Sequence, residues 1–124
     1  KDFKKISSHR KTIFSIYKKI LSKNPRIKFL DTVDNNLTNS HWLCTIIVDK
    51  NRLELQNFLR KINIETNQVH FRNDRYSIFK KKKRSKEFTN MNNYENNYLV
   101  IPLNLKINSK DATYIGLSIN KFLK

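Results

Sequence analysis

His41-Trp42-Leu43-Cys44-Thr45-Ile46-Ile47-Val48 is a nearly continuous run of apolar and β-branched residues in a chain of 124. Such a run is typical of a strand buried inside a sheet, so we expect it to be the central strand of the fold. Asp49 follows it directly and is of a type that often caps helices. We therefore expect Asp49 to cap a helix over residues 51–62.

The rest of the chain divides into segments with helical or extended patterns. Apolar steps of three and four residues predict helices over 3–23 and 51–62, a weak helix over 87–97, and a last helix from an Asn108–Asp111 capping box to Phe122. Extended segments are predicted over 26–30, 64–71 and 98–103. Residues 1–124 should thus form one α/β domain of the α+β type, with a small, mostly antiparallel sheet of about four strands covered by helices.

The net charge of +16 comes from 26 basic and 10 acidic residues, and it raises the question of a polyanionic partner. Lysine supplies 19 of the basic residues, and 17 asparagines accompany them. Nucleic-acid-binding proteins tend to rely more on arginine, so biased composition explains the charge better than nucleic-acid binding does. A stand-alone basic module that binds RNA or DNA stays as the alternative hypothesis.

Several kinds of site are excluded by the residue types present. One glycine cannot form a glycine-rich phosphate loop, and His9, His41 and His70 lack metal-ligand spacing. Cys44 is the only cysteine, which rules out an intrachain disulfide and favours a reduced, cytoplasmic setting. No apolar run approaches the roughly 20 residues that cross a bilayer, so no membrane partner is expected. The start lacks Met and a signal core, and we expect the chain to be part of a longer protein.

Polar side chains are dense between Glu65 and Arg75. In an extended backbone Gln68, His70 and Arg72 face one side, and Asn73-Asp74 then favours a turn. Donors and acceptors meeting at a strand's end suit a polar ligand site, while a solvated turn is an equally good interpretation.

Two other features could bind a ligand but have simpler explanations. Residues 80–84 of the basic run 80–86 could bind phosphates or act as a nuclear address, although an exposed loop is the better interpretation. Trp42 and Tyr98 could stack on a base, but their apolar strands predict core packing.

A set of motifs follows in one order along the chain. The motifs are His9-Arg10 with Ile13 and Tyr17, Ser40-His41-Trp42, Arg52 with Leu53, Leu55 and Leu59, Ile62–Thr66, Val69-His70-Phe71, Leu99–Leu103, and Asp111 with Ile115. The ordered set resembles the C-terminal small domain of the DegT/DnrJ-type (StrS-like) sugar aminotransferases, which are fold-type-I enzymes dependent on pyridoxal phosphate. The chain departs from the family where Asn63 replaces a glycine, Phe71 replaces a tyrosine, and a second histidine after His70 is missing.

The resemblance implies a function for the intact enzyme. An amino group would pass from glutamate to pyridoxal phosphate and then to a nucleotide-linked keto-sugar. The internal lysine and most cofactor ligands would lie in the large domain, so this chain is expected to hold no catalytic, cofactor or metal residue and to be inactive alone.

The resemblance also implies roles for parts of this chain. Substrate binding would fall on His70 and Phe71, with Arg72 and Asn73 beside them, in the active site across a homodimer. The helix in 1–24 would lead to the large domain and expose an apolar patch along 3–21.

Overall fold

The run His41–Val48 does supply the central strand, as predicted, although regular pairing begins at Cys44. A computed structural model describes residues 2–31, 36–79 and 88–124. Its elements are α1 (Phe3–Leu21), β1 (Ile27–Phe29), β2 (Cys44–Val48), α2 (Arg52–Lys61), the 3-10 turns η1 (Asn73–Arg75) and η2 (Ser77–Phe79), α3 (Thr89–Glu95), β3 (Tyr98–Ile101) and α4 (Ser109–Phe122). The predicted α/β class with an antiparallel sheet is confirmed.

The sheet has the order β1-β2-β3, and both pairs are antiparallel. It has three strands within the described residues, rather than about four, because the extended segment 64–71 pairs only through Asn67 and Val100. These two residues exchange backbone hydrogen bonds of 3.2 and 2.8 Å. Beyond this bridge the segment is held by hydrogen bonds from the side chains of Gln68 and Tyr98. It therefore forms no ladder of backbone hydrogen bonds with β3.

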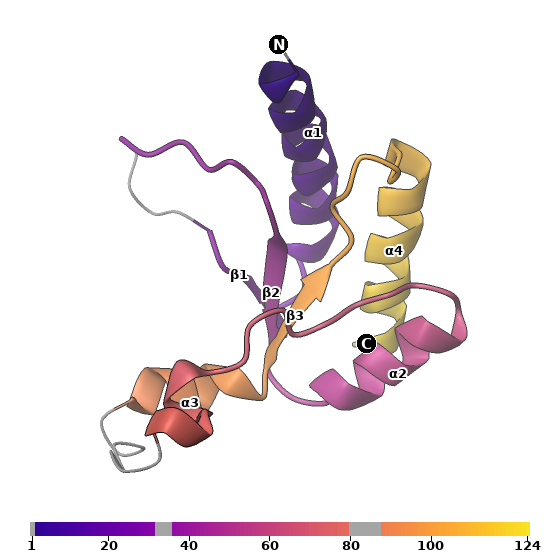
Figure 1. Ribbon diagram of the computed structural model, residues 1–124. Coiled ribbons are helices and arrows are strands. Elements are labelled where there is room, and N and C mark those ends of the chain that lie inside the picture. The colour runs from indigo at the N-terminus through magenta and orange to yellow at the C-terminus, as the bar shows by residue number, and fades with distance from the viewer. Residues whose placement is uncertain (1, 32–35, 80–87) are drawn as a thin grey trace.

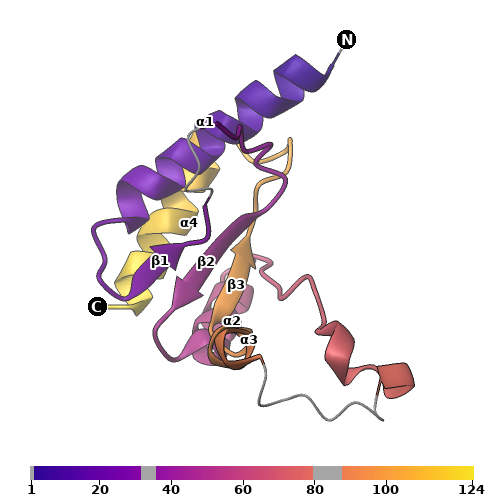
Figure 2. The ribbon, with the colours of Figure 1, turned by 90° about the vertical axis from the view of Figure 1, so that its left-hand side faces the viewer.

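The two faces of the sheet differ because side chains alternate along each strand. Cys44, Ile46 and Val48 point into the core, where Leu99 and Ile101 of β3 join them. α1 and α4 lie side by side over this face, and α2 packs against α4 and β3 (Figures 1 and 2). The other face looks toward residues 67–79, which lie on the side of the sheet away from α1 and α4 (Figure 2).

The helices α1 and α4 approach closely at the single glycine of the protein. A Cβ on Gly116 would lie 3.1 Å from Cγ2 of Ile20, so a larger residue would push the helices apart. About one turn before Ile20 in α1, the buried Tyr17 hydroxyl donates to the Pro102 carbonyl oxygen at 2.8 Å. These contacts tie α1 to its own domain.

The expected apolar patch along α1 is therefore wrong. Ile13, Phe14, Tyr17 and Leu21 all turn into the core, and among the described residues Phe3 is the only large apolar side chain of α1 that is exposed. No helix in the described part of the chain is both long and apolar enough to span a bilayer.

The ends of the helices agree with the sequence-based predictions except at Asp49. Asp49 does not cap α2, because Asn51 takes that position in a left-handed conformation with φ of 63°. Asp49 instead accepts hydrogen bonds from the Lys50 amide and from Arg26. Asn63 adopts the predicted left-handed backbone, with φ of 61°. The predicted capping box of α4 is present between Asn108 and Asp111.

Candidate functional site

A hollow of about 870 Å³ lies between the outer face of the sheet and the segment 67–76. The sheet contributes side chains such as Thr45 and Val100, and α3 contributes Met91 and Tyr94. All four residues predicted to bind substrate line this hollow, namely His70, Phe71, Arg72 and Asn73. The structure therefore brings the predicted site residues together, while their contact with a substrate stays a prediction.

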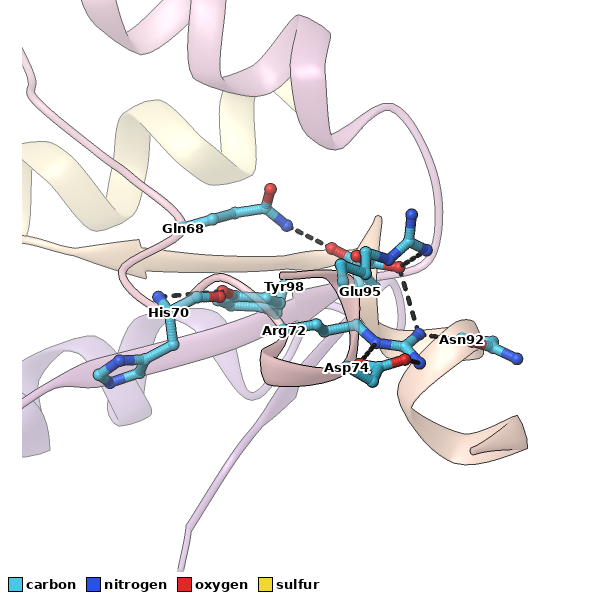
Figure 3. Close-up of polar contacts among 8 residues, drawn as sticks. Gln68, His70, Arg72, Asp74, Asn92, Glu95 and Tyr98 are labelled. Carbon is cyan, nitrogen blue, oxygen red and sulfur yellow. Dashed lines mark hydrogen bonds and ion pairs between the residues drawn. The ribbon is translucent and has the colours of Figure 1, made fainter. Parts of the chain in front are cut away.

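The His70 side chain is exposed, while its backbone is held by the Tyr98 hydroxyl. The Tyr98 hydroxyl accepts from the His70 amide at 3.3 Å and donates to the His70 carbonyl at 2.7 Å. The imidazole itself points away from the polar cluster around Arg72 (Figure 3). It lies near Trp42, with ring centroids 6.2 Å apart. His70 thus combines a held main chain with a ring available to a ligand.

Arg72 is 7% exposed and lies at the centre of a network of polar contacts (Figure 3). Its Nε and Nη2 donate to the two carboxylate oxygens of Asp74 at 2.9 and 2.6 Å. Its Nη1 donates to Asn92, in the middle of α3, and to Glu95 at 3.3 Å. The bidentate fork is a geometry that arginine can make and lysine cannot.

The same network fixes the chemistry of Asp74. The hydrogen bonds from Arg72 hold the pKa of the Asp74 carboxyl below its usual range, because they favour the charged form. Arg75 also donates to Glu95, and Gln68 donates to the Glu95 main-chain oxygen. These contacts join the segment to α3, and Arg72 already makes four hydrogen bonds within this network.

Phe71 and Asn73 complete the predicted set. The Phe71 ring is 58% exposed and meets Tyr76 edge-on, with centroids 5.2 Å apart. Asn73 is exposed and starts the turn η1, where its carbonyl accepts from the Tyr76 amide. Both residues belong to the rim of the hollow.

Trp42 was expected in the core and is instead 62% exposed, so that prediction is wrong. The preceding residue, His41, has a φ of 49° and is itself buried against the Phe14 ring. This left-handed residue breaks the strand alternation just before β2, which sends Trp42 outward. Tyr98 is half-buried and faces the hollow rather than the core. The exposed position of Trp42 therefore depends on the backbone angle of His41, which the sequence pattern does not predict.

The hollow was tested as a place for pyridoxal phosphate, the cofactor that the resemblance implies. This cofactor is held through a lysine amine, and none of the residues lining the hollow is a lysine. The lining therefore does not fit a cofactor site of its own. The described residues also contain no group of three or more side chains placed to hold a metal ion. The basic run 80–86 lies outside the described residues.

Comparison with known proteins identifies the family. The family model of the DegT/DnrJ/EryC1/StrS aminotransferases matches residues 1–120. The chain belongs to this family. No curated protein matches the sequence.

Several solved structures share the fold of this chain. DesV from S. venezuelae, solved in complex with a ketimine intermediate, superposes with a TM-score of 0.86 at 14% identity over 95% of this chain and 32% of DesV. PseC from Helicobacter pylori, an aminotransferase involved in the biosynthesis of pseudoaminic acid, gives 0.80 at 17% identity over 94% of this chain and 32% of PseC. DesI, solved in the presence of its TDP-sugar product, gives 0.84 at 13% identity over 98% of this chain and 32% of DesI. This member of the family thus spans about a third of the length of these three proteins.

Proposed function

We propose that this chain acts as the small domain of a pyridoxal-phosphate-dependent sugar aminotransferase and helps to bind a nucleotide-linked keto-sugar. The observation that carries the proposal is His70, whose ring stands free in the hollow while Tyr98 holds its main chain on both sides. The family match and the fold support the reaction class. The cofactor and its lysine would come from residues outside the matched third of such enzymes.

The four predicted residues would have different roles in substrate binding. His70 would donate to or accept from a sugar hydroxyl, because a neutral imidazole offers one donor and one acceptor. Phe71 would provide an apolar wall and Asn73 an amide at the rim. Arg72 would position the segment, since its donors already bind Asp74, Asn92 and Glu95. The working assembly would be a cytoplasmic homodimer.

Binding of the sugar to this chain tests the proposal. The isotopically labelled protein would be titrated with a TDP-linked keto-sugar while its amide NMR signals are followed. We expect saturable shifts centred on His70 that are weakened at least about tenfold in His70→Ala, because a hydrogen bond to a ligand polar group is lost. Tyr114→Ala is the matched control, since Tyr114 is an exposed aromatic residue on α4. Equal binding by His70→Ala and the wild type would contradict the proposal.

The nucleic-acid alternative predicts a different response. A basic module would bind oligonucleotides with an affinity that falls steeply as salt is added. Within the described residues, no observation adds to the net charge in its support, and the family match favours the aminotransferase hypothesis.

A further inference from the structure

The segment that leads into β2 is held against α1 by a buried histidine. His41 is 8% exposed, and its ring lies against the Phe14 ring of α1, with centroids 4.4 Å apart. We refer to residues 36–43 as the Trp42 arm. His41 is the one buried residue of this arm, whose other side chains are exposed or half-buried. The packing of the arm on α1 therefore depends on the His41 ring.

The backbone of His41 is strained. Its φ of 49° lies in the left-handed region, which residues other than glycine adopt only rarely. Such a conformation persists where the surrounding contacts hold it. These contacts are the packing on Phe14 and a 2.7 Å hydrogen bond from the His41 amide to the side-chain oxygen of Asn39. Loss of the ring contact would thus let the backbone relax and the arm leave α1.

The place of the His41 ring does not accommodate a charged imidazole. Its Nδ1 is buried and makes no hydrogen bond within the described residues. A protonated ring has a hydrogen on both nitrogens, so one buried N–H would lack an acceptor. The Phe14 ring offers little compensation as a cation–π partner, because the Lys18 ammonium already lies 5.8 Å from its centroid.

The charged groups around His41 do not reverse this preference. Burial is the main cause that lowers the pKa of His41; Asp31 acts in the opposite direction, and Lys11 and Lys18 of α1 add to the lowering. The Asp31 carboxylate is already engaged by the Lys18 ammonium at 2.8 Å and by the Asn39 side chain at 3.1 Å. A further cation of α1, Arg10, lines a hollow beside the arm.

We propose that protonation of His41 releases the Trp42 arm from α1 and moves Trp42 away from His70. Trp42 follows His41 directly, and its ring centroid lies 6.2 Å from that of His70. The arm stays attached at Cys44, where the regular pairing of β2 with β3 begins. Release would thus change the surroundings of the candidate site while the sheet stays intact. This inference stands on the geometry of the arm and holds whether or not His70 binds a sugar.

The direction of the pH effect follows from the lowered pKa of His41. The packed arm holds the neutral ring, whereas a released ring titrates at the ordinary histidine pKa of about 6.5. The packed state is therefore fully favoured above about pH 6.5. This preference is lost as the pH falls from that value toward the lowered pKa of the packed ring.

The fluorescence of Trp42, the single tryptophan, reports the release. Emission of the full chain would be recorded from about pH 8 to about pH 5, with far-UV circular dichroism measured alongside. We expect a reversible change in emission with a midpoint below about pH 6.5 and no loss of helix. His70→Gln removes the other titratable ring beside Trp42 and should keep the change. Constant emission, loss of helix over the same range, or disappearance of the change in His70→Gln would overturn the proposal.

Two substitutions of His41 should fix the arm in opposite states. His41→Phe keeps an aromatic ring against Phe14 and cannot be protonated, so it should show the neutral-pH emission throughout. His41→Asn suits a left-handed backbone but has no ring, so it should show the acid emission throughout. The second variant keeps the test decisive where a phenylalanine with positive φ disturbs folding. A pH-dependent change that persists in His41→Asn would show that another group titrates and that the proposal is wrong.

Discussion

The two sides of the sheet are held together by different forces. On the side of α1 and α4, the core consists of buried apolar side chains, and the sheet contributes Ile46 and Leu99 at 0% exposure. On the other side, the elements η1, η2 and α3 contain no buried apolar residue and are joined mainly by polar contacts. We refer to the first side as the helical body and to residues 67–79 with α3 as the polar lobe. The comparison indicates that the polar lobe opens locally while the helical body stays folded.

The largest expected effect comes from a cavity in the helical body. Ile46→Ala should lower the free energy of unfolding by about 2–5 kcal/mol, because it removes buried methyl groups and leaves a void. Ile78→Ala in the polar lobe is the control, since Ile78 is 82% exposed and its loss should cost within about 0.5 kcal/mol. Urea unfolding of both variants measures the difference. Similar losses in the two would mean that Ile78 is packed against other apolar groups and that the polar lobe is not held mainly by polar contacts.

The next largest effect concerns the centre of the polar lobe. Arg72→Lys should speed amide hydrogen exchange of residues 68–76 about 10- to 100-fold, because lysine cannot make the bidentate contact with Asp74 while also reaching α3. Exchange in β2 should change little. Arg60→Lys, at an exposed position, should leave both regions as they are. Unchanged exchange in the polar lobe of Arg72→Lys would show that the network is not what holds it.

The contrast between the two sides also explains which features were predictable from the sequence. The central strand, the three long helices and the capping box of Asn108 followed from apolar periodicity and local capping chemistry, both of which act within a few residues. The fourth strand was wrong because the tyrosine that binds the His70 main chain lies 28 residues away in β3. Long-range polar contacts of this kind leave no periodic signal.

The candidate site was predictable to a similar degree. The polar density of Glu65–Arg75 located the segment, and the resemblance selected His70. The buried state of Arg72 depended on Asn92 and Glu95 of α3, a helix predicted only weakly. Trp42 was misplaced because a left-handed backbone is too uncommon at histidine for the sequence to predict it at His41.

A smaller effect should come from one hydroxyl of β3. Tyr98→Phe removes the group that contacts both the amide and the carbonyl of His70, which should speed exchange at the His70 amide and its neighbours about 5- to 10-fold. Tyr114→Phe is the matched control, because the Tyr114 ring is exposed on α4. Sugar binding should weaken in Tyr98→Phe without any loss of core stability. Protection of the His70 amide that survives in Tyr98→Phe would argue against this anchor.

The smallest expected effect is a dependence on pH that is confined to the polar lobe. Arg72 lowers the pKa of Asp74 in the folded state, so folding favours the charged carboxylate. The stabilisation is thus fully present above the usual aspartate pKa of about 4 and is lost as the pH falls through the lowered folded value. The Arg72 Nε–H NMR signal, which reports the bond to Asp74, should therefore shift only below about pH 4.

Two variants serve as controls. Asp74→Asn should abolish this shift with pH, and Asp49→Asn, which breaks an ion pair with Arg26 near the helical body, should keep it. A step at the ordinary aspartate pKa, or one that persists in Asp74→Asn, would show that the network does not hold the charged form.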